Sequence, residues 1–219
     1  MRSGVMSEKT PPKGIAEQAT EKAAEQNVRV ALIRAANQCF TASDYDSVSI
    51  RKIAQQAGVN MAMIRYYFGN KLGLFEAMVT EQIHPIHQRA KTLQKHQAKP
   101  TIADLINEFY QTMIPNPDFP RFLFRLMNSD GSSEAKEVIF KLFTPIVELT
   151  PMPKALLEEC GDFDPMMVKM SLLSLMIFPF VMPLSMAKLH GYQLNDEFYT
   201  QLAKHNIALI QHGLFGGQQ

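Results

Sequence analysis

The pattern of apolar and polar positions along this 219-residue chain predicts helices throughout, with no alternating strand pattern. The most regular stretches lie in residues 30–40 and 50–57, where apolar residues recur three and four positions apart. Segments rich in Gly, Pro, Asn or Asp separate the predicted helices. These helices span residues 20–42, 50–57, 60–68, 72–96, 102–114, 118–128, 133–149, 154–160, 165–190 and 195–213. The sequence therefore predicts an all-α fold.

Helix-capping residues define the first three helices. Thr20, Ser49 and Asn60 each precede a periodic stretch and are good N-caps. Gly58 follows the second helix and can take the left-handed conformation that ends it. We expect residues 1–19, which precede the first cap, to form a disordered tail.

The two short helices joined at Gly58 form a predicted helix-turn-helix. Apolar residues of this unit face inward and tie the two helices to the first one; they are Ile50, Ile53, Val59, Ile64 and Phe68. The opposite face of the third helix is left free. It consists of Met61, Ala62, Arg65 and Tyr66, with Met63 and Tyr67 on its flanks.

A short helical face with an arginine and tyrosines is suited to the DNA major groove. Arg65 could contact a guanine edge or a phosphate, or be a solvated surface charge. Ala62 and the methionines could pack on thymine methyl groups, or the methionines could be plain surface residues. Tyr66 and Tyr67 could donate to phosphate oxygens, although Tyr67 could equally be half buried against the first helix.

Residues next to this face add possible phosphate contacts. Lys71 begins the fourth helix, while Ser49 and Arg51 begin the second. The predicted DNA-binding residues are therefore Ser49, Arg51, Asn60, Met61, Ala62, Met63, Arg65, Tyr66, Tyr67 and Lys71.

Charge is distributed unevenly, although the net charge of the chain is only +1. Residues 27–75 contain 6 basic and 2 acidic side chains, whereas residues 76–219 contain 12 basic and 15 acidic ones. A basic segment attached to a mildly acidic body favours nucleic-acid binding, although such an excess can also serve solubility alone.

Three stretches resemble the TetR-type transcriptional regulators: LIRAANQCF, SIRKIAQQAGVN and IRYYFGNKLGLF. NIALIQHGLFG is similar to the last helix of such proteins. The resemblance implies a DNA-binding domain at residues 20–75 and a helical effector-binding and dimerisation domain at residues 76–219, linked by the fourth helix. It also implies that Ser49, Tyr67 and Lys71 position the DNA backbone, and that the groove is lined or read by Arg51, Met61, Ala62, Arg65 and Tyr66.

This chain departs from the family pattern at several positions. Family members commonly have glycine at the positions of Asp44 and Ala62, threonine at Met63 and an aromatic residue at Arg65. The last three lie on the outward face of the third helix or on its flank, so the operator of a relative cannot be assumed for this chain.

The resemblance implies a dimeric regulator, usually a repressor, that binds a palindromic operator through two heads. The dimer interface would come from residues 165–190 and 195–213, and we expect Leu172 and Ile177 to face the partner. Residues 170–187 carry no charge and nearly match the length of a membrane span. Pro179 and the lack of flanking basic or aromatic clusters favour a buried or interface helix instead.

The middle helices are rich in aromatic residues and methionine, which suits either a pocket for an apolar or aromatic effector or ordinary core packing. The candidate ligand-binding residues are His84, Phe109, Met113, Phe124, Met127, Phe143 and Met170. Glu81 and His84 have the Glu-x-x-His spacing of di-iron bundles, but no second copy occurs. We therefore expect no metal site and no cofactor.

Two other classes of function are alternatives to a transcriptional regulator. A DNA-binding or scaffold protein without a role in transcription could use the same head. An enzyme is disfavoured because no nucleophile–base pairing has a recognisable signature. Cys39 and Cys160 have neither disulfide nor zinc spacing, and no secretory signal is evident, so we expect a reduced, cytoplasmic location.

Overall fold

The computed structural model describes residues 13–95, 101–131, 133–149 and 163–214. Within these ranges the chain is helical and has no strand, as predicted. The head contains α1 (Lys13–Ala42), a 3₁₀ turn (Tyr45–Ser47), α2 (Ile50–Ala57) and α3 (Ala62–Phe68). The body contains α4 (Lys71–Lys95), α5 (Ile102–Met113), α6 (Asp118–Asn128), α7 (Ser133–Leu149), α9 (Pro165–Val181), α10 (Leu184–Leu189) and α11 (Asp196–Leu214). The helix predicted at 154–160 lies outside the described residues.

The first helix begins earlier than predicted. It starts at Lys13 rather than at Thr20, so Thr20 lies inside α1 instead of capping it. The segment KGIAEQA before Thr20 contains mostly good helix formers. Extending an existing helix is easier than starting one, which outweighs the capping tendency of a single threonine. Residues 1–12 lie outside the described part of the chain.

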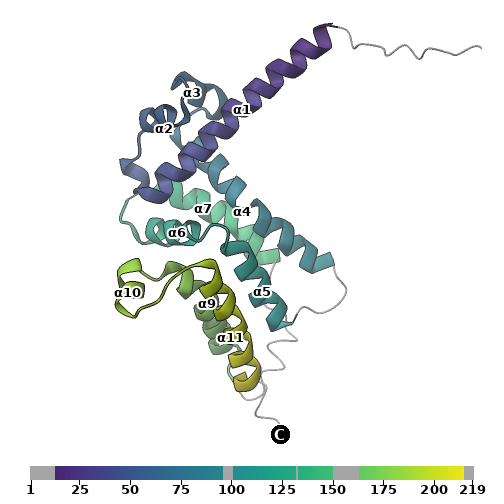
Figure 1. Cartoon of the computed structure of the whole chain (residues 1–219), viewed down its shortest axis with the longest axis vertical. Helices are drawn as coiled ribbons and strands as arrows, with labels where there is room; N and C mark the ends of the chain where they lie inside the picture. The colour runs from purple at the N-terminus through teal and green to yellow at the C-terminus, as the bar shows by residue number, and fades with distance from the viewer. Residues whose placement is uncertain (1–12, 96–100, 132, 150–162, 215–219) are drawn as a thin grey trace, which may run out of the picture.

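The helix predicted at 165–190 is in fact two helices. α9 ends at Val181 and α10 begins at Leu184, because Met182 has an extended backbone with ψ of 130°. Pro183 follows Met182, and a proline disfavours the α conformation of the residue before it. The break turns α10 away from the axis of α9 (Figure 1).

Buried apolar side chains form two clusters. In Figure 1 the helices of the first cluster, α1 to α4, α6 and α7, lie mostly above α9 and α11, which contribute to the second. The first core joins the head to α4, α6 and α7; its members include Leu32, Phe40, Ile53, Ile64, Phe75, Met78, Phe122 and Ile139. The second core joins α5, α9 and α11; its members include Ile106, Tyr110, Leu172, Phe180, Tyr199 and Ile210. Ile86 of α4 packs against both. The head thus shares its core with part of the body.

A buried polar contact holds the second core together. Pro179 lies inside α9 and has no N–H, so it cannot bond the carbonyl of Leu175 one turn before it. That carbonyl instead accepts hydrogen bonds from Tyr110 Oη of α5 at 2.9 Å and Asn206 Nδ2 of α11 at 3.1 Å. Asn206 Nδ2 also donates to Tyr110 Oη at 3.1 Å. Burial raises the pKa of Tyr110 to about 12, so its hydroxyl remains a donor at neutral pH.

Replacing the asparagine tests this contact. Asn206→Leu should lower the free energy of unfolding by about 1–3 kcal/mol, because it removes two buried hydrogen bonds and leaves polar partners less satisfied. Urea unfolding measures the change. Gln201→Leu on the same helix is the control, since the Gln201 side chain is exposed and its partner in the described part of the chain is the likewise exposed Glu197. Equal effects of the two substitutions would contradict the structural role of the contact.

Candidate nucleic-acid interface

The turn between α2 and α3 has the predicted caps. Ser49 Oγ accepts from the backbone N–H of Lys52 at 3.2 Å and so closes the start of α2. Gly58 has φ of 68° and donates its N–H to the carbonyls at the end of α2. A residue with a Cβ is strained at that positive φ, so glycine supports the sharp turn into α3.

The start of α3 differs slightly from the prediction. The helix itself begins at Ala62 rather than at Asn60, but Asn60 Oδ1 accepts from the Ala62 N–H at 2.8 Å. Asn60 therefore still satisfies a free donor in the first turn. The predicted inward residues are in place: Ile53 and Ile64 are fully buried, and Ile50, Val59 and Phe68 pack against the same core.

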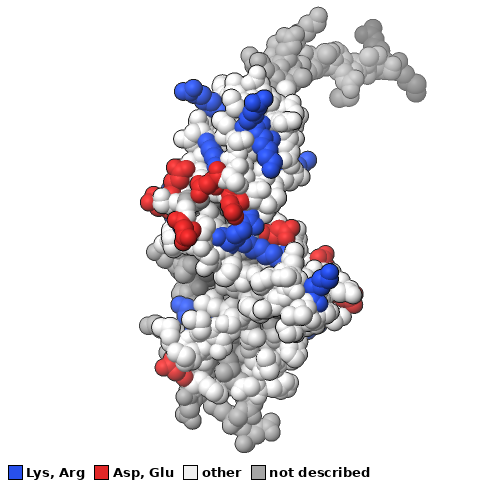
Figure 2. Space-filling model, turned by 90° about the vertical axis from the view of Figure 1, so that its left-hand side faces the viewer, with Lys and Arg blue, Asp and Glu red and all other residues white. Residues whose placement is uncertain are grey.

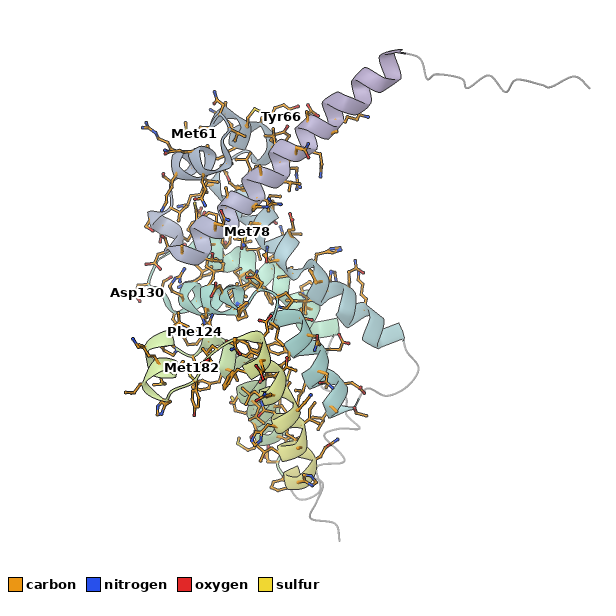
Figure 3. All side chains as sticks on the ribbon, in the orientation of Figure 1. Met61, Tyr66, Met78, Phe124, Asp130 and Met182 are labelled. Carbon is orange, nitrogen blue, oxygen red and sulfur yellow. The ribbon has the colours of Figure 1, made fainter. Side chains whose placement is uncertain are left out.

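The outward face of α3 is free, as the helical spacing predicted. Met61, Ala62, Arg65 and Tyr66 are all exposed, Tyr66 to 68%. Met61 and Tyr66 lie at the end of the molecule farthest from α10 and α11 (Figure 3). Met63 is half-buried and packs against the first core. The four exposed side chains form what we term the recognition face.

Tyr67 takes the second of the two arrangements considered for it. Its side chain is half-buried against the first core, and its hydroxyl is enclosed without a hydrogen-bond partner. Burial, with a smaller contribution from Glu25 of α1, raises the pKa of this phenol. Tyr67 therefore lies beside the recognition face and does not point out of it.

The two other predicted phosphate contacts already have partners within the chain. Ser49 Oγ is occupied as the cap of α2. Lys71 Nζ lies 4.2 Å from the centre of the Tyr45 ring and donates to the Asp46 carbonyl at 3.5 Å. Burial lowers the pKa of this ammonium group. Arg51, by contrast, is exposed on α2 and is available to a ligand.

The charge distribution agrees with this geometry. Lys and Arg side chains lie at the head end of the face shown in Figure 2, and acidic side chains gather below them. Exposed basic residues of the head include Arg34, Arg51, Lys52 and Arg65, and exposed acidic residues at its junction with the body include Asp44, Asp46, Asp130 and Glu134. Positive charge is therefore concentrated where the recognition face lies.

The seven predicted effector contacts do not form one group. Those on the surface are His84, Phe124 and Met170. Those packed against the first core are Met127 and Phe143, and those in or against the second core are Phe109 and Met113. Phe124 is on the side of α6 that faces α9 and α10 (Figure 3). Within the described residues, His, Cys, Asp and Glu nowhere gather in a group suited to a metal ion.

The two residues predicted to face a dimer partner differ in exposure. Ile177 is 40% exposed, but Leu172 is 2% exposed and belongs to the second core of its own subunit. Leu172 therefore cannot face a partner, because it lies one turn after buried Val168 on the inner side of α9. No helix in the described ranges combines the length and apolar character needed to cross a bilayer.

Sequence reasoning missed a set of contacts between the head and the body. Arg125 of α6 donates to carbonyls at the end of α1, and Tyr45 donates to Glu134 Oε1 of α7 at 2.9 Å. These partners lie more than eighty positions apart in the chain, as the separations of 84 and 89 show. The local sequence hints at these contacts only through Arg125, a basic residue in the last turn of the helix predicted at 118–128.

The fold and the recognition face define a helix-turn-helix protein with a helical body. Residues 32–78 match the sequence model described as bacterial regulatory proteins, tetR family. The Bacillus subtilis (strain 168) protein named Probable HTH-type transcriptional regulator YttP is 26% identical over 105 residues, covering 46% of this chain and 51% of that protein. The chain thus matches about half the length of this curated relative.

Solved structures match over most of the chain. A Clostridium perfringens regulator assigned to fatty acid metabolism has a TM-score of 0.61 and 16% identity, covering 85% of this chain and 97% of that one. NalD, the secondary repressor of the MexAB-OprM multidrug efflux pump in Pseudomonas aeruginosa, has a TM-score of 0.58 and 21% identity, covering 84% and 96%. At these identities the likeness concerns the fold. The match at residues 32–78 shows that the helix-turn-helix segment is similar to the tetR family, and the solved structures show a similar fold over most of the chain.

Removing the Tyr67 hydroxyl distinguishes a buried role from a phosphate contact. Tyr67→Phe should leave the free energy of unfolding unchanged or raise it by about 1 kcal/mol, because it removes an enclosed polar group without a partner. DNA affinity should stay the same. Thermal unfolding and fluorescence anisotropy measure both. Weaker DNA binding by a variant of wild-type stability would instead show that the hydroxyl contacts DNA.

Proposed function

We propose that this protein is a dimeric, sequence-specific DNA-binding transcriptional regulator that acts in the cytoplasm. We further propose that it is a repressor, released when a small apolar or aromatic effector binds the body. The observation that carries the proposal is the recognition face. It exposes an arginine and a tyrosine on a short helix whose other side packs against the core.

Each residue of the recognition face has a chemical role in this proposal. Arg65 can make two parallel hydrogen bonds to the O6 and N7 atoms of a guanine. Tyr66 can donate to a phosphate or stack on the groove edge, and Met61 and Ala62 can pack on thymine methyl groups. Arg51 at the start of α2 would hold the backbone. Base contacts would specify the sequence, while the basic head as a whole would supply salt-dependent affinity.

One such head offers few contacts, so specific binding calls for two heads. Half-sites read by a two-fold dimer are about 34–36 Å apart, or a multiple of that. An exposed apolar surface on the body supports dimerisation. We term it the apolar face; it consists of Met166, Met167, Met170, Leu173, Ile177 and Phe178 on α9 and Leu184, Met186 and Leu189 on α10. Exposed apolar side chains gathered on two consecutive helices are typical of a protein–protein interface.

An effector would act by favouring one spacing of the two heads. α4 is the candidate lever, because it directly follows α3, has Pro85 in its interior and packs against both cores through Ile86. A coupling free energy of about 1–3 kcal/mol would lower operator affinity about 5- to 150-fold. NalD, with the same fold, is a repressor, which supports the proposed direction of control.

Removing the arginine of the recognition face tests base reading. Arg65→Ala should weaken binding to an operator selected from random-sequence DNA by about 1–3 kcal/mol and relax the preference at one position of each half-site. The reason is the loss of a bidentate base contact. Anisotropy titrations against the operator and its single-base variants measure both effects.

Lys141→Ala is the matched control, because it removes one positive charge from an exposed position on α7, outside the head and the expected dimer helices, and its exposed ion pair with Glu76 adds little stability. This variant should bind every sequence nearly as well as the wild type. If Arg65→Ala kept wild-type affinity and specificity, or matched the control, the recognition face would be assigned wrongly.

A charge within the apolar face tests the dimer. Ile177→Lys should yield monomers, because a lysine in the interface would be buried without a partner, and operator binding should weaken with it. Sedimentation measures the mass. Phe140→Lys on α7 is the control, since Phe140 is also a large exposed apolar residue but lies outside the apolar face. A dimer that survives Ile177→Lys would contradict this choice of interface.

A further inference from the structure

We propose that Arg125 is the positioning residue through which the body fixes the orientation of the DNA-binding head. This inference rests on the proposed function and assigns a role to a residue outside the recognition face. Arg125 lies in the last turn of α6. In Figure 1, α6 runs just below the C-terminal end of α1.

The C-terminal end of α1 lacks the usual local capping features, a basic residue in the last turn and a glycine after it. Its last turn contains no basic residue, and it is followed by Ser43 and Asp44 instead of a glycine. The last carbonyls of a helix lack partners within that helix and carry partial negative charge. A cation from elsewhere in the fold can therefore stabilise this end.

Arg125 supplies that cation from the body. Its Nη2 donates to the carbonyl oxygens of Phe40, Thr41 and Ser43 at 3.0, 2.9 and 3.2 Å. Its Nε lies 3.1 Å from Asp44 Oδ1. One guanidinium thus contacts every residue but one from Phe40 to Asp44, where the chain leaves α1.

The carbonyl contacts matter more than the ion pair. The side chains of Arg125 and Asp44 are 40% and 70% exposed, and exposed ion pairs add little stability. Hydrogen bonds from a charged donor to carbonyls that have no other helical partner are stronger and depend on geometry. The planar guanidinium can reach the carbonyls and Asp44 at once, which a lysine cannot do.

The body holds Arg125 firmly. Phe122 and Leu126 on the same helix are buried in the first core, and Phe122 packs edge-on against Phe75 of α4 with ring centres 6.0 Å apart. The Arg125 guanidinium carbon lies 6.0 Å from the centre of the Phe122 ring. A displacement of α6 would therefore carry the guanidinium with it.

The segment that Arg125 holds leads straight into the helix-turn-helix. Tyr45 follows Asp44 and is fixed by Glu134, by Lys71 above its ring, and by stacking on Phe40 with ring centres 5.5 Å apart. Ser49, four residues later, begins α2. Movement at the Arg125 contact would thus reach α1 and the start of α2 together, and with them the recognition face.

Two arginines of α6 allow a matched test. Arg125→Met removes the contacts to α1 but keeps much of the side-chain length. Arg121→Met, one turn earlier, removes the same charge, but the partners of Arg121 among the described residues are Asp118 and Tyr199, both within the body. Operator affinity, thermal stability and amide hydrogen exchange of residues 44–48 would be measured for both variants and for the wild type.

Arg125→Met should weaken operator binding about fivefold or more, in the range of known couplings between sites. It should also speed exchange of the Ser47 and Val48 amides, which bond Asp44 and Tyr45 carbonyls. Arg121→Met should do neither, even if it lowers the melting temperature as much. Arg125→Lys, which keeps a cation at the helix end, should recover part of both losses.

Unchanged exchange at Ser47 and Val48 in Arg125→Met would overturn the proposal, as would equal effects of the two methionine variants or no recovery with lysine. If the wild type bound no selected DNA, the proposed function would fail instead. The exchange comparison would then decide by itself whether Arg125 positions the head.

Discussion

The burial of Ile53 and Ile64 in one shared core is the constraint on which the rest of the structure depends. Both side chains have no exposed area, and they bring α2 and α3 against α1 and α4. Because a helix has only one inward side, committing Ile64 to the core leaves Arg65 and Tyr66 on the outside. The surface that we propose to read DNA is thus a consequence of core packing.

The same core extends past the head, and this gives the body a means of acting on it. Phe122 of α6 and Ile139 of α7 belong to the cluster that contains Ile64. Packed interiors transmit displacement because they have few voids to absorb it. The polar contacts of Arg125 and Tyr45 link the body to a specific part of the head, because they hold Ser43 and the 3₁₀ turn just before α2.

Local features of the sequence predicted local structure well. The Ser49 cap, the left-handed Gly58 and the spacing of Ile53 and Ile64 each depend on neighbours within a few positions, so one segment was enough to infer them. Features that depend on partners far away in the sequence could not be predicted from local patterns. The inward orientation of Leu172 and the contacts of Arg125 with α1 are set by helix–helix packing, which periodicity does not specify. For Tyr67 the sequence left a half-buried and an outward arrangement equally open, and packing against the first core decides between them. The break at Pro183 was visible in the sequence, but the uncharged run around it suggested one continuous helix.

Selection of bound duplexes from a random-sequence DNA pool tests the central claim most directly. If the recognition face of two subunits reads DNA, the selected sequences should share two inverted half-sites whose centres are about 34–36 Å apart, or a multiple of that. The Arg65→Ala variant should lose the preference at one position in each half-site. A pool that gains no common sequence, or one that converges on a single unrepeated site, would contradict the account.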